Sequence, residues 1–295
     1  MTKKVIFWVL AVFISLSIMV YQRLTGPTYE KEYELVYNGT EYKFDLPRSH
    51  GGNSNCPVQI GLPEPFQGEL VYRRFPTEEP WDTLKMARDG SDLVASLPHQ
   101  PPAGKLEYHL NLKVNGKIHS LGDKENIVMR FKGSVPAWAQ IPHILLMILT
   151  VICSTAIIFF AAANLPHFKK YLAYTIILLI LGGFVFGPVV QYYAFGQFWT
   201  GWPFGQDLTD NKVLLALIAF LIAWFLRHKS YAKWMAIAAA IIMLAVYLIP
   251  HSMNGSELDP ETGQVITGII FPLLVKINND NPNFNYFRPL KSFKK

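Results

Sequence analysis

The sequence predicts a membrane protein of mixed α and β structure, with an exported β domain and a bundle of apolar helices. Three observations predict this fold class. Only 16% of the 295 residues are charged and 51% are hydrophobic, whereas a soluble domain averages about 25% charged residues. Long apolar runs occur only at the N-terminus and after about residue 137. The segment between them alternates apolar and polar residues, which is typical of half-buried strands.

Residues 1–23 are expected to form an N-terminal transmembrane anchor. Lys3 and Lys4 precede the apolar stretch VIFWVLAVFISLSIMV, and Tyr21, Gln22 and Arg23 follow it. A cleaved signal peptide would end in a pair of small residues around its cleavage site, and none follows here. The lysines favour a cytoplasmic N-terminus.

Residues 24–136 are predicted to form a periplasmic, immunoglobulin-like β-sandwich. Two dipeptides, Asn38-Gly39 and Asn115-Gly116, each separate alternating segments, and Asn-Gly suits the tight hairpin turn that needs positive φ at both central residues. The predicted strands are YELVY, EYKFDL, VQIGL, GELVYRRF, DLVASL, LEYHLNLKV, KIHSL and NIVMRF. The stretch around Tyr108 resembles the Tyr-bearing strand of immunoglobulin-like or fibronectin-type domains.

Residues 137–250 are predicted to form a four-helix membrane module, which brings the transmembrane helices to five. The expected helices cover residues 141–163, 172–190, 213–226 and 234–249. Small residues at Gly182-Gly183 permit close helix approach, and Pro188 is expected to kink its helix. One hypothesis for this region is a small-molecule or lipid site between the helices near 182–188.

Charge asymmetry indicates the orientation. Lys169-Lys170 and the RHKSYAK segment after residue 226 fall on the cytoplasmic side if the N-terminus is cytoplasmic, as the positive-inside rule prefers. The loop of residues 195–211 and the tail of residues 251–295 are then periplasmic. The apolar stretch 265–275 is too short to span as a helix and is expected at the interface or against the sandwich. The predicted location is a bacterial inner membrane.

The loop FGQFWTGWPFGQDLTDNK, residues 195–212, is richer in glycine, tryptophan and polar residues than a connection requires. Its candidate partner-contacting or structural residues are Trp199, Trp202, Phe204, Asp207, Thr209, Asp210 and Asn211. The alternative interpretation is structural. The aromatic residues would form an interfacial belt, and Thr209 or Asp210 would cap the following helix.

A metal or haem site is the alternative for the outer face. The topology places His143, His251, Asp207, Asp210 and Glu257 at the same membrane surface. Imidazole and carboxylate ligands suit transition metals, and histidines ligate haem, so haem b or copper is the candidate cofactor. The competing interpretation assigns these histidines a hydrogen-bonded structural role. A further candidate is copper at the SHGGNSNC segment, which otherwise reads as an exposed polar loop.

The motif WTGWPFGQDLTDNK (residues 199–212), together with the later IPHSMNGSELD, resembles an uncharacterised family of bacterial integral membrane proteins. Members of that family share an N-terminal anchor, an exported β domain and a helical module. The resemblance implies an inner-membrane location and transfers no activity.

No catalytic motif occurs in the sequence, which favours a non-enzymatic function. The sequence lacks GxGxxG, Walker, HExxH, CxxCH and GxSxG patterns. Although the net charge is +6, the basic residues form no patch interleaved with aromatics, so nucleic acid is not an expected partner. The leading hypothesis is a membrane subunit or assembly factor that docks a periplasmic or membrane protein. The alternative is a haem- or copper-binding protein in electron transfer or metal handling.

Overall fold

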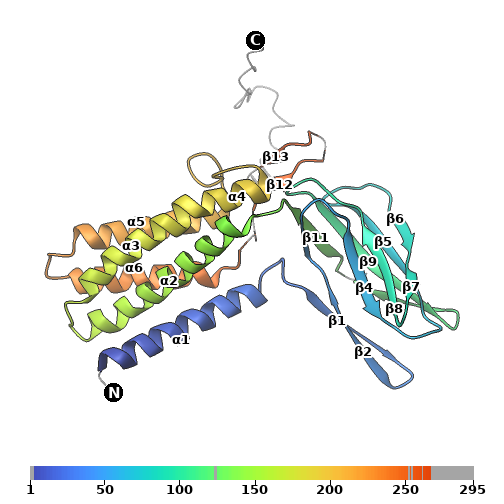
Figure 1. Ribbon diagram of the computed structural model, residues 1–295, viewed down its shortest axis with the longest axis horizontal. Helices are drawn as coiled ribbons and strands as arrows, with labels where there is room; N and C mark the ends of the chain where they lie inside the picture. Colours follow the sequence, from blue (N-terminus) through green and yellow to red (C-terminus); the bar gives the residue numbers. More distant parts are fainter. Residues whose placement is uncertain (1–2, 123–124, 252, 254, 261, 267–295) are drawn as a thin grey trace, which may run out of the picture.

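The computed structural model describes residues 3–122, 125–251, 253, 255–260 and 262–266. A group of apolar helices occupies one side of the molecule and a set of β-sheets the other, with the short strands β12 and β13 beside the place where the two meet (Figure 1). The structure is therefore a mixed α and β fold, as predicted.

The helical unit contains the apolar runs of the sequence. Its helices are α1 (Lys3–Leu24), α2 (Ala137–Ala162), α3 (Phe168–Leu179), η1 (Ile180–Phe186), α4 (Gly187–Phe195), α5 (Leu208–Phe225) and α6 (Ala232–Leu248). Four stretches are long and apolar enough to cross a membrane: α1, α2, the continuous helix Phe168–Phe195, and α5. The fifth predicted span is the apolar helix α6, which has 17 residues and is shorter than these four.

One apolar core joins the helices. Phe160 of α2 is fully buried, and its ring packs against Phe7 and Trp8 of α1 and Tyr171 of α3. Contact between α1 and α2 also includes a buried hydrogen bond, 2.9 Å long, between the hydroxyls of Ser15 and Thr155. The predicted anchor is thus a packed member of the helical unit.

The helix Phe168–Phe195 changes its winding in the middle. Residues 180–186 form the π-helix η1, and Pro188 follows it near the start of α4. A proline has no N–H to donate to the helical ladder, and changes of winding occur at such interruptions. A Cβ on Gly182 would lie 2.9 Å from the sulfur of Met147, and one on Gly183 would lie 2.7 Å from Val213 Cγ1. The predicted close helix approach at these glycines is confirmed.

All eight predicted strand segments form strands. The strands are β1 (Lys31–Tyr37), β2 (Thr40–Leu46), β3 (Ser49–Gly51), β4 (Cys56–Gly61), β5 (Gln67–Arg74), β6 (Asp82–Lys85), β7 (Ala87–Asp89), β8 (Asp92–Leu97), β9 (Lys105–Val114), β10 (Lys117–Leu121), β11 (Ile127–Lys132), β12 (Glu257–Leu258) and β13 (Val265–Ile266). Both predicted hairpins are confirmed, with φ of 50° and 78° at Asn38-Gly39 and 48° and 75° at Asn115-Gly116. Of the stretch 265–275, only Val265–Ile266 lies within the described residues.

The strands enclose a second apolar core. One sheet has the order β3-β11-β9-β5-β6, with β10 also paired to β9, and a smaller sheet has the order β4-β8-β7. Strands β1 and β2 form a separate hairpin that contributes Leu35 and Phe44 to the same core. Tyr108 of β9 is fully buried, and its hydroxyl donates a 2.8 Å hydrogen bond to the carbonyl of Pro47.

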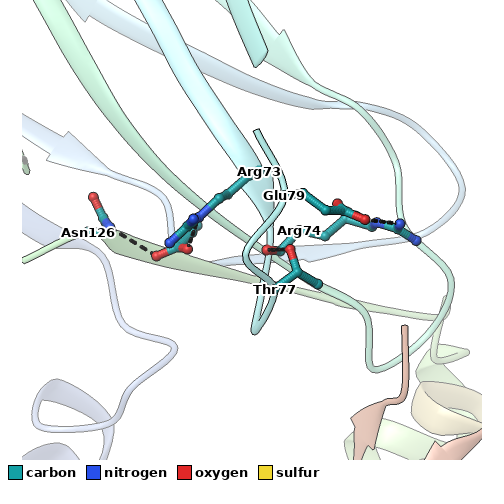
Figure 2. A network of polar contacts seen from close by, with 6 residues as sticks. Arg73, Arg74, Thr77, Glu79 and Asn126 are labelled. Carbon is teal, nitrogen blue, oxygen red and sulfur yellow. Dashed lines mark hydrogen bonds and ion pairs between the residues drawn. The ribbon is translucent and has the colours of Figure 1, made fainter. Parts of the chain in front are cut away.

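A polar network crosses the larger sheet (Figure 2). Arg73 of β5 lies directly opposite Glu107 of β9, and the two form an ion pair. The second oxygen of Glu107 accepts a 2.9 Å hydrogen bond from Asn126. Glu107 is 6% exposed, so these donors satisfy a carboxylate that burial alone would destabilise.

One backbone hydrogen bond joins the β domain to a helix, and two further contacts join the β domain to β12. The backbone N–H of Gly133, between β11 and α2, donates a 2.9 Å hydrogen bond to the carbonyl of Ala194 in α4. The N–H of Leu258 donates to the carbonyl of Ala103 over 3.2 Å, and Glu257 forms an ion pair with Lys105. The β domain is therefore held against the end of the helical unit where α4 terminates.

Candidate functional site

A cavity of about 480 Å³ lies at the end of the helical unit that faces the sheets. Its apolar walls include Met19, Ile144, Met147, Val213, Met243 and Val246. Its polar lining includes Arg130, Gln191, Asp207, Asp210, Lys212 and His251. This size is in the range of small-molecule sites, which combine mostly apolar walls with a few placed polar groups.

Arg130 enters this site from the β domain. It belongs to β11, is 6% exposed, and donates a 2.6 Å hydrogen bond from Nη2 to the carbonyl of Ser256. Its guanidinium carbon lies 4.5 Å from the ring centroid of Phe195, and its buried Nε has no hydrogen-bond partner among the described residues. Burial lowers the pKa of Arg130 from its usual value, while the carboxylates of Asp207 and Glu257 act in the opposite direction. The group nevertheless keeps its charge, as arginine does in proteins.

Lys212 enters from the opposite side, near the start of α5. It is 6% exposed, and its ammonium donates hydrogen bonds to the carbonyls of Ile249 (2.8 Å) and Pro250 (3.3 Å), just beyond the end of α6. Within the described part of the chain, no carboxylate lies within 4 Å of the charged nitrogens of Arg130 or Lys212. The cavity thus has two buried cations without a direct counter-ion.

The two aspartates of the loop fix the beginning of α5. Asp207 is the N-cap, because its side chain accepts a 2.7 Å hydrogen bond from the N–H of Thr209. The prediction that Thr209 or Asp210 caps the helix is therefore wrong. Asp210 instead lies inside the first turn, and its Oδ2 accepts hydrogen bonds from both the N–H (2.6 Å) and the hydroxyl (2.9 Å) of Thr200.

The rest of the loop is held by its own polar and aromatic residues. Asn211 accepts a 2.7 Å hydrogen bond from the N–H of Trp202, and the indole of Trp199 stacks on Phe184 with centroids 5.3 Å apart. By contrast, Trp202 is 69% exposed and Phe204 is 81% exposed. The candidate loop residues therefore divide into an internal structural set and two aromatic side chains that face outward.

His143 of α2 is oriented by the π-helix. Its Nδ1 lies 2.8 Å from the carbonyl oxygen of Gly182 in η1. A carbonyl can only accept a hydrogen bond, so Nδ1 carries the proton. In the neutral ring Nε2 therefore presents a lone pair. π-Helical turns occur frequently at functional sites, and this one supplies the acceptor that fixes the imidazole.

His251 follows α6 and also lines the cavity. Although the residue as a whole is exposed, desolvation by the surrounding protein lowers the pKa of its imidazole, and Lys212 and His143 act in the same direction. The imidazole is consequently neutral at physiological pH. It adds a hydrogen-bonding group to the polar end of the cavity without adding charge.

The structure brings together four of the five predicted metal-site residues. His143, His251, Asp207 and Asp210 all line the cavity, whereas Glu257 is paired with Lys105 of the β domain. Within the described part of the chain, no group of three or more His, Cys, Asp or Glu side chains is arranged to hold a metal ion. A metal site here stays a prediction.

Two residues that sequence reasoning missed dominate the charge of the site. Arg130 lies in the predicted strand NIVMRF, where an arginine between Met129 and Phe131 is the sequence signal of a charge in a buried strand. Lys212 ends the polar loop motif, immediately before the apolar run of α5. A lysine placed there, next to the hydrophobic segment of a membrane helix, is a functional hypothesis by default.

No protein-family model, curated protein or solved structure matches the chain. The resemblance of the loop motif to a family of bacterial membrane proteins accordingly stays a prediction. The cavity is the feature of the structure that points to a function.

Proposed function

We propose that this membrane protein binds a lipid-like amphiphile in the cavity between its helices and its β domain, and that it does so without catalysing a reaction. The observation that carries the proposal is the division of one cavity into an apolar part and a charged part. Met147, Val213 and Met243 line it from three different helices, whereas Arg130 and Lys212 line it from the β domain and the start of α5.

The position of the cavity supports a ligand that arrives from the bilayer. Met19, Gln22 and Arg23 of α1 belong to the lining, and α1 buries only Ala11 and Ser15 completely against the other helices. Most of the surface of α1 is exposed, so the part of the cavity wall that α1 forms borders the bilayer. This arrangement favours lateral access for an apolar chain.

The proposal is tested by filling the apolar part of the cavity. Ala216 of α5 is 1% exposed and lines the cavity, so Ala216→Phe should expel the bound molecule. Leu215 is the neighbouring residue, is 51% exposed, and faces away from the core, so Leu215→Phe is the matched control. Native mass spectrometry of the protein in a mild detergent should show a retained amphiphile in the wild type and in L215F, and none in A216F.

Two results would overturn the proposal. One is a wild-type protein that retains no amphiphile and takes up none of those added; the other is equal retention in A216F. If A216F does not elute as a folded species, Val246→Phe fills the same cavity from α6 and replaces it.

A second candidate function rests on His143. Metal-ligating histidines almost always donate their other ring nitrogen to a carbonyl or carboxylate, which is the arrangement of His143 Nδ1 and Gly182. Haem b or copper, with His143 and His251 as ligands, is therefore the alternative occupant. An absorption spectrum and metal analysis of chelator-free protein test it, and a colourless, metal-free protein contradicts it.

We also propose the partner-docking function that the sequence predicts. It concerns the exposed aromatic side chains of the loop of residues 195–211, and these side chains are outside the cavity lining. The exposed side chains of Trp202 and Phe204 support a protein contact at the outer loop. We further propose that the β domain is an immunoglobulin-like sandwich in the periplasm of a bacterium and that α6 is the fifth span. Purification of the protein without a co-eluting partner after gentle extraction would contradict the docking role.

A further inference from the structure

We infer that the polar head of the bound amphiphile is an anion, a phosphate or a carboxylate, held between Arg130 and Lys212. This inference rests on the proposed function, because it names the chemical class of the ligand for the same cavity. It starts from the unusual environment of the two cations, each 6% exposed and each bordering the cavity.

Arg130 has hydrogen-bond donors that its contacts with the described residues leave unused. A guanidinium has five N–H groups, and among the described residues that of Arg130 donates to one side-chain or backbone acceptor, the carbonyl of Ser256. Its Nε is buried and unpartnered among the described residues, although the same side chain borders the cavity. A buried donor without an acceptor is costly, and an anionic oxygen in the cavity would satisfy it.

The environment of Lys212 is the second argument. Its ammonium is fixed by two neutral carbonyls, those of Ile249 and Pro250, which orient the group without neutralising it. Removing a charge from water is expensive unless a counter-charge compensates for it. A ligand anion that reaches both Lys212 and Arg130 would supply that counter-charge.

The aspartates do not remove the need for an anion. Asp207 uses Oδ1 to cap α5, and its Oδ2 lies 3.3 Å from the position that a Cβ on Gly255 would take, beside the guanidinium of Arg130. It therefore offsets part of one positive charge. Asp210 uses Oδ2 to accept two hydrogen bonds from Thr200, which stabilise its own negative charge.

Formal charges give the same result. Arg23, Arg130 and Lys212 bring three positive charges to the lining, and Asp207 and Asp210 bring two negative charges. Among the described residues the lining therefore has a formal charge of +1, which the single negative charge of an anionic head would neutralise.

The orientation of the ligand follows from the same placement. The cations lie where the helices meet the β domain, and the apolar walls continue between the helices. The head of the amphiphile would therefore lie toward the β domain, with its hydrocarbon part between α2, α5 and α6. Gly183 and Ala216 keep the helix surfaces there free of larger side chains.

The experiment compares amphiphilic probes that have similar hydrocarbon chains and different polar heads. Protein in phosphatidylcholine nanodiscs is titrated with dodecyl phosphate, dodecanoate and uncharged dodecanol, and binding is followed by native mass spectrometry. We expect the two anionic probes to bind about tenfold more tightly than dodecanol, since a hydrogen-bonded ion pair replaces a neutral contact. Dioleoyl phosphatidylglycerol is a further arm, which distinguishes a two-chain membrane lipid from a single-chain acid as the source of the anion.

Substitutions of Arg130 and Lys212 test whether these two cations cause the preference for anionic probes. Arg130→Gln and Lys212→Gln should each weaken dodecyl phosphate binding by about tenfold while leaving dodecanol binding unchanged. Arg130→Lys keeps the charge and should retain most of the preference, which keeps the test valid if R130Q does not fold. Arg74→Gln, in an exposed ion pair of the β domain outside the cavity lining, is the control.

The outcomes distinguish the proposal of an anionic head from the proposal of an amphiphile site. Equal binding of dodecyl phosphate, dodecanoate and dodecanol, sensitive to A216F, would overturn the anionic head while leaving the amphiphile site in place. An anion preference that survives both R130Q and K212Q would overturn the assignment to these cations. Failure of every probe to bind would overturn the proposed function itself.

Discussion

At the scale of single residues, Cys56 shows how the β domain controls the chemistry of a side chain. Cys56 is in β4, is 2% exposed, and belongs to the same core as Tyr108. Burial raises the pKa of its thiol to about 11, from an ordinary value of 9.0. Because only the thiolate reacts with alkylating reagents, the folded protein should protect this cysteine.

The pH dependence follows from the direction of this shift. At pH 8 only about one Cys56 side chain in a thousand is ionised, so iodoacetamide should modify it far more slowly in the folded protein than in urea. Since the folded pKa lies above the unfolded one, the contribution of Cys56 to the free energy of unfolding is fully present below about pH 9 and is lost as the pH rises toward 11. Mass spectrometry of a Cys153→Ser variant, in which only Cys56 can be alkylated, measures the modification rate, and urea titrations at pH 8 and pH 10.5 measure the change in the free energy of unfolding. Equal alkylation rates in the folded and unfolded states would contradict the protection of Cys56.

Residues also differ in how well the sequence predicts them. Asn38-Gly39 and Asn115-Gly116 could be predicted, because a two-residue turn depends only on local φ angles. Arg130 could not be placed at a cavity between helices, since its position depends on how β11 packs against Phe195 and Ser256. His143 was predicted as a site residue, but its partner Gly182 lies 39 positions away and becomes visible only in the fold.

At the scale of elements, the start of α5 explains a displaced boundary. Hydropathy places this helix at residues 213–226, whereas it begins at Leu208. Asp210, Asn211 and Lys212 form its polar first turns, since each makes a hydrogen bond outside the helix, to Thr200, Trp202 and the end of α6. An apolar run marks the part of a helix that meets lipid or core, and it cannot mark a polar turn that contacts a loop or a cavity.

The connection from β11 to α2 contains a glycine that is closely packed against α4. A Cβ on Gly133 would lie 2.2 Å from the carbonyl oxygen of Tyr193, closer than any real contact. Gly133→Ala should therefore displace α4 from this connection and destabilise the protein by about 1–3 kcal/mol. Gly51→Ala is the control, because its Cβ would meet only the flexible end of Lys132 at 3.4 Å. Thermal unfolding in detergent measures both, and equal melting temperatures for G133A and G51A would contradict the expectation.

At the scale of the whole molecule, the start of α1 and the α2–α3 and α5–α6 connections lie at the end of the helical unit that is away from the sheets (Figure 1), and lysines lie in or next to each of them. Lys4 lies 3.4 Å from His167, and Lys233 donates a 2.8 Å hydrogen bond to Asn164, so the N-terminus and both intervening loops meet there. Helix α6 starts at this basic end and finishes at Leu248, and the carbonyl of the next residue, Ile249, binds Lys212 beside the cavity. Its 17 residues therefore run from the basic end to the cavity, which favours a fifth crossing.

The positive-inside rule then predicts which end of the molecule faces the cytoplasm. We expect the basic end to be cytoplasmic and the outer loop, with the cavity and the sheets, to face the other side. Single cysteines test this in a background of Cys56→Ala and Cys153→Ser: Trp202→Cys at the exposed loop and Lys229→Cys at the basic end. A membrane-impermeant maleimide should label W202C in intact cells and K229C only after permeabilisation. The reverse pattern would place the cavity and its two cations on the cytoplasmic side, where the ligand would have to be drawn from the inner leaflet of the bilayer.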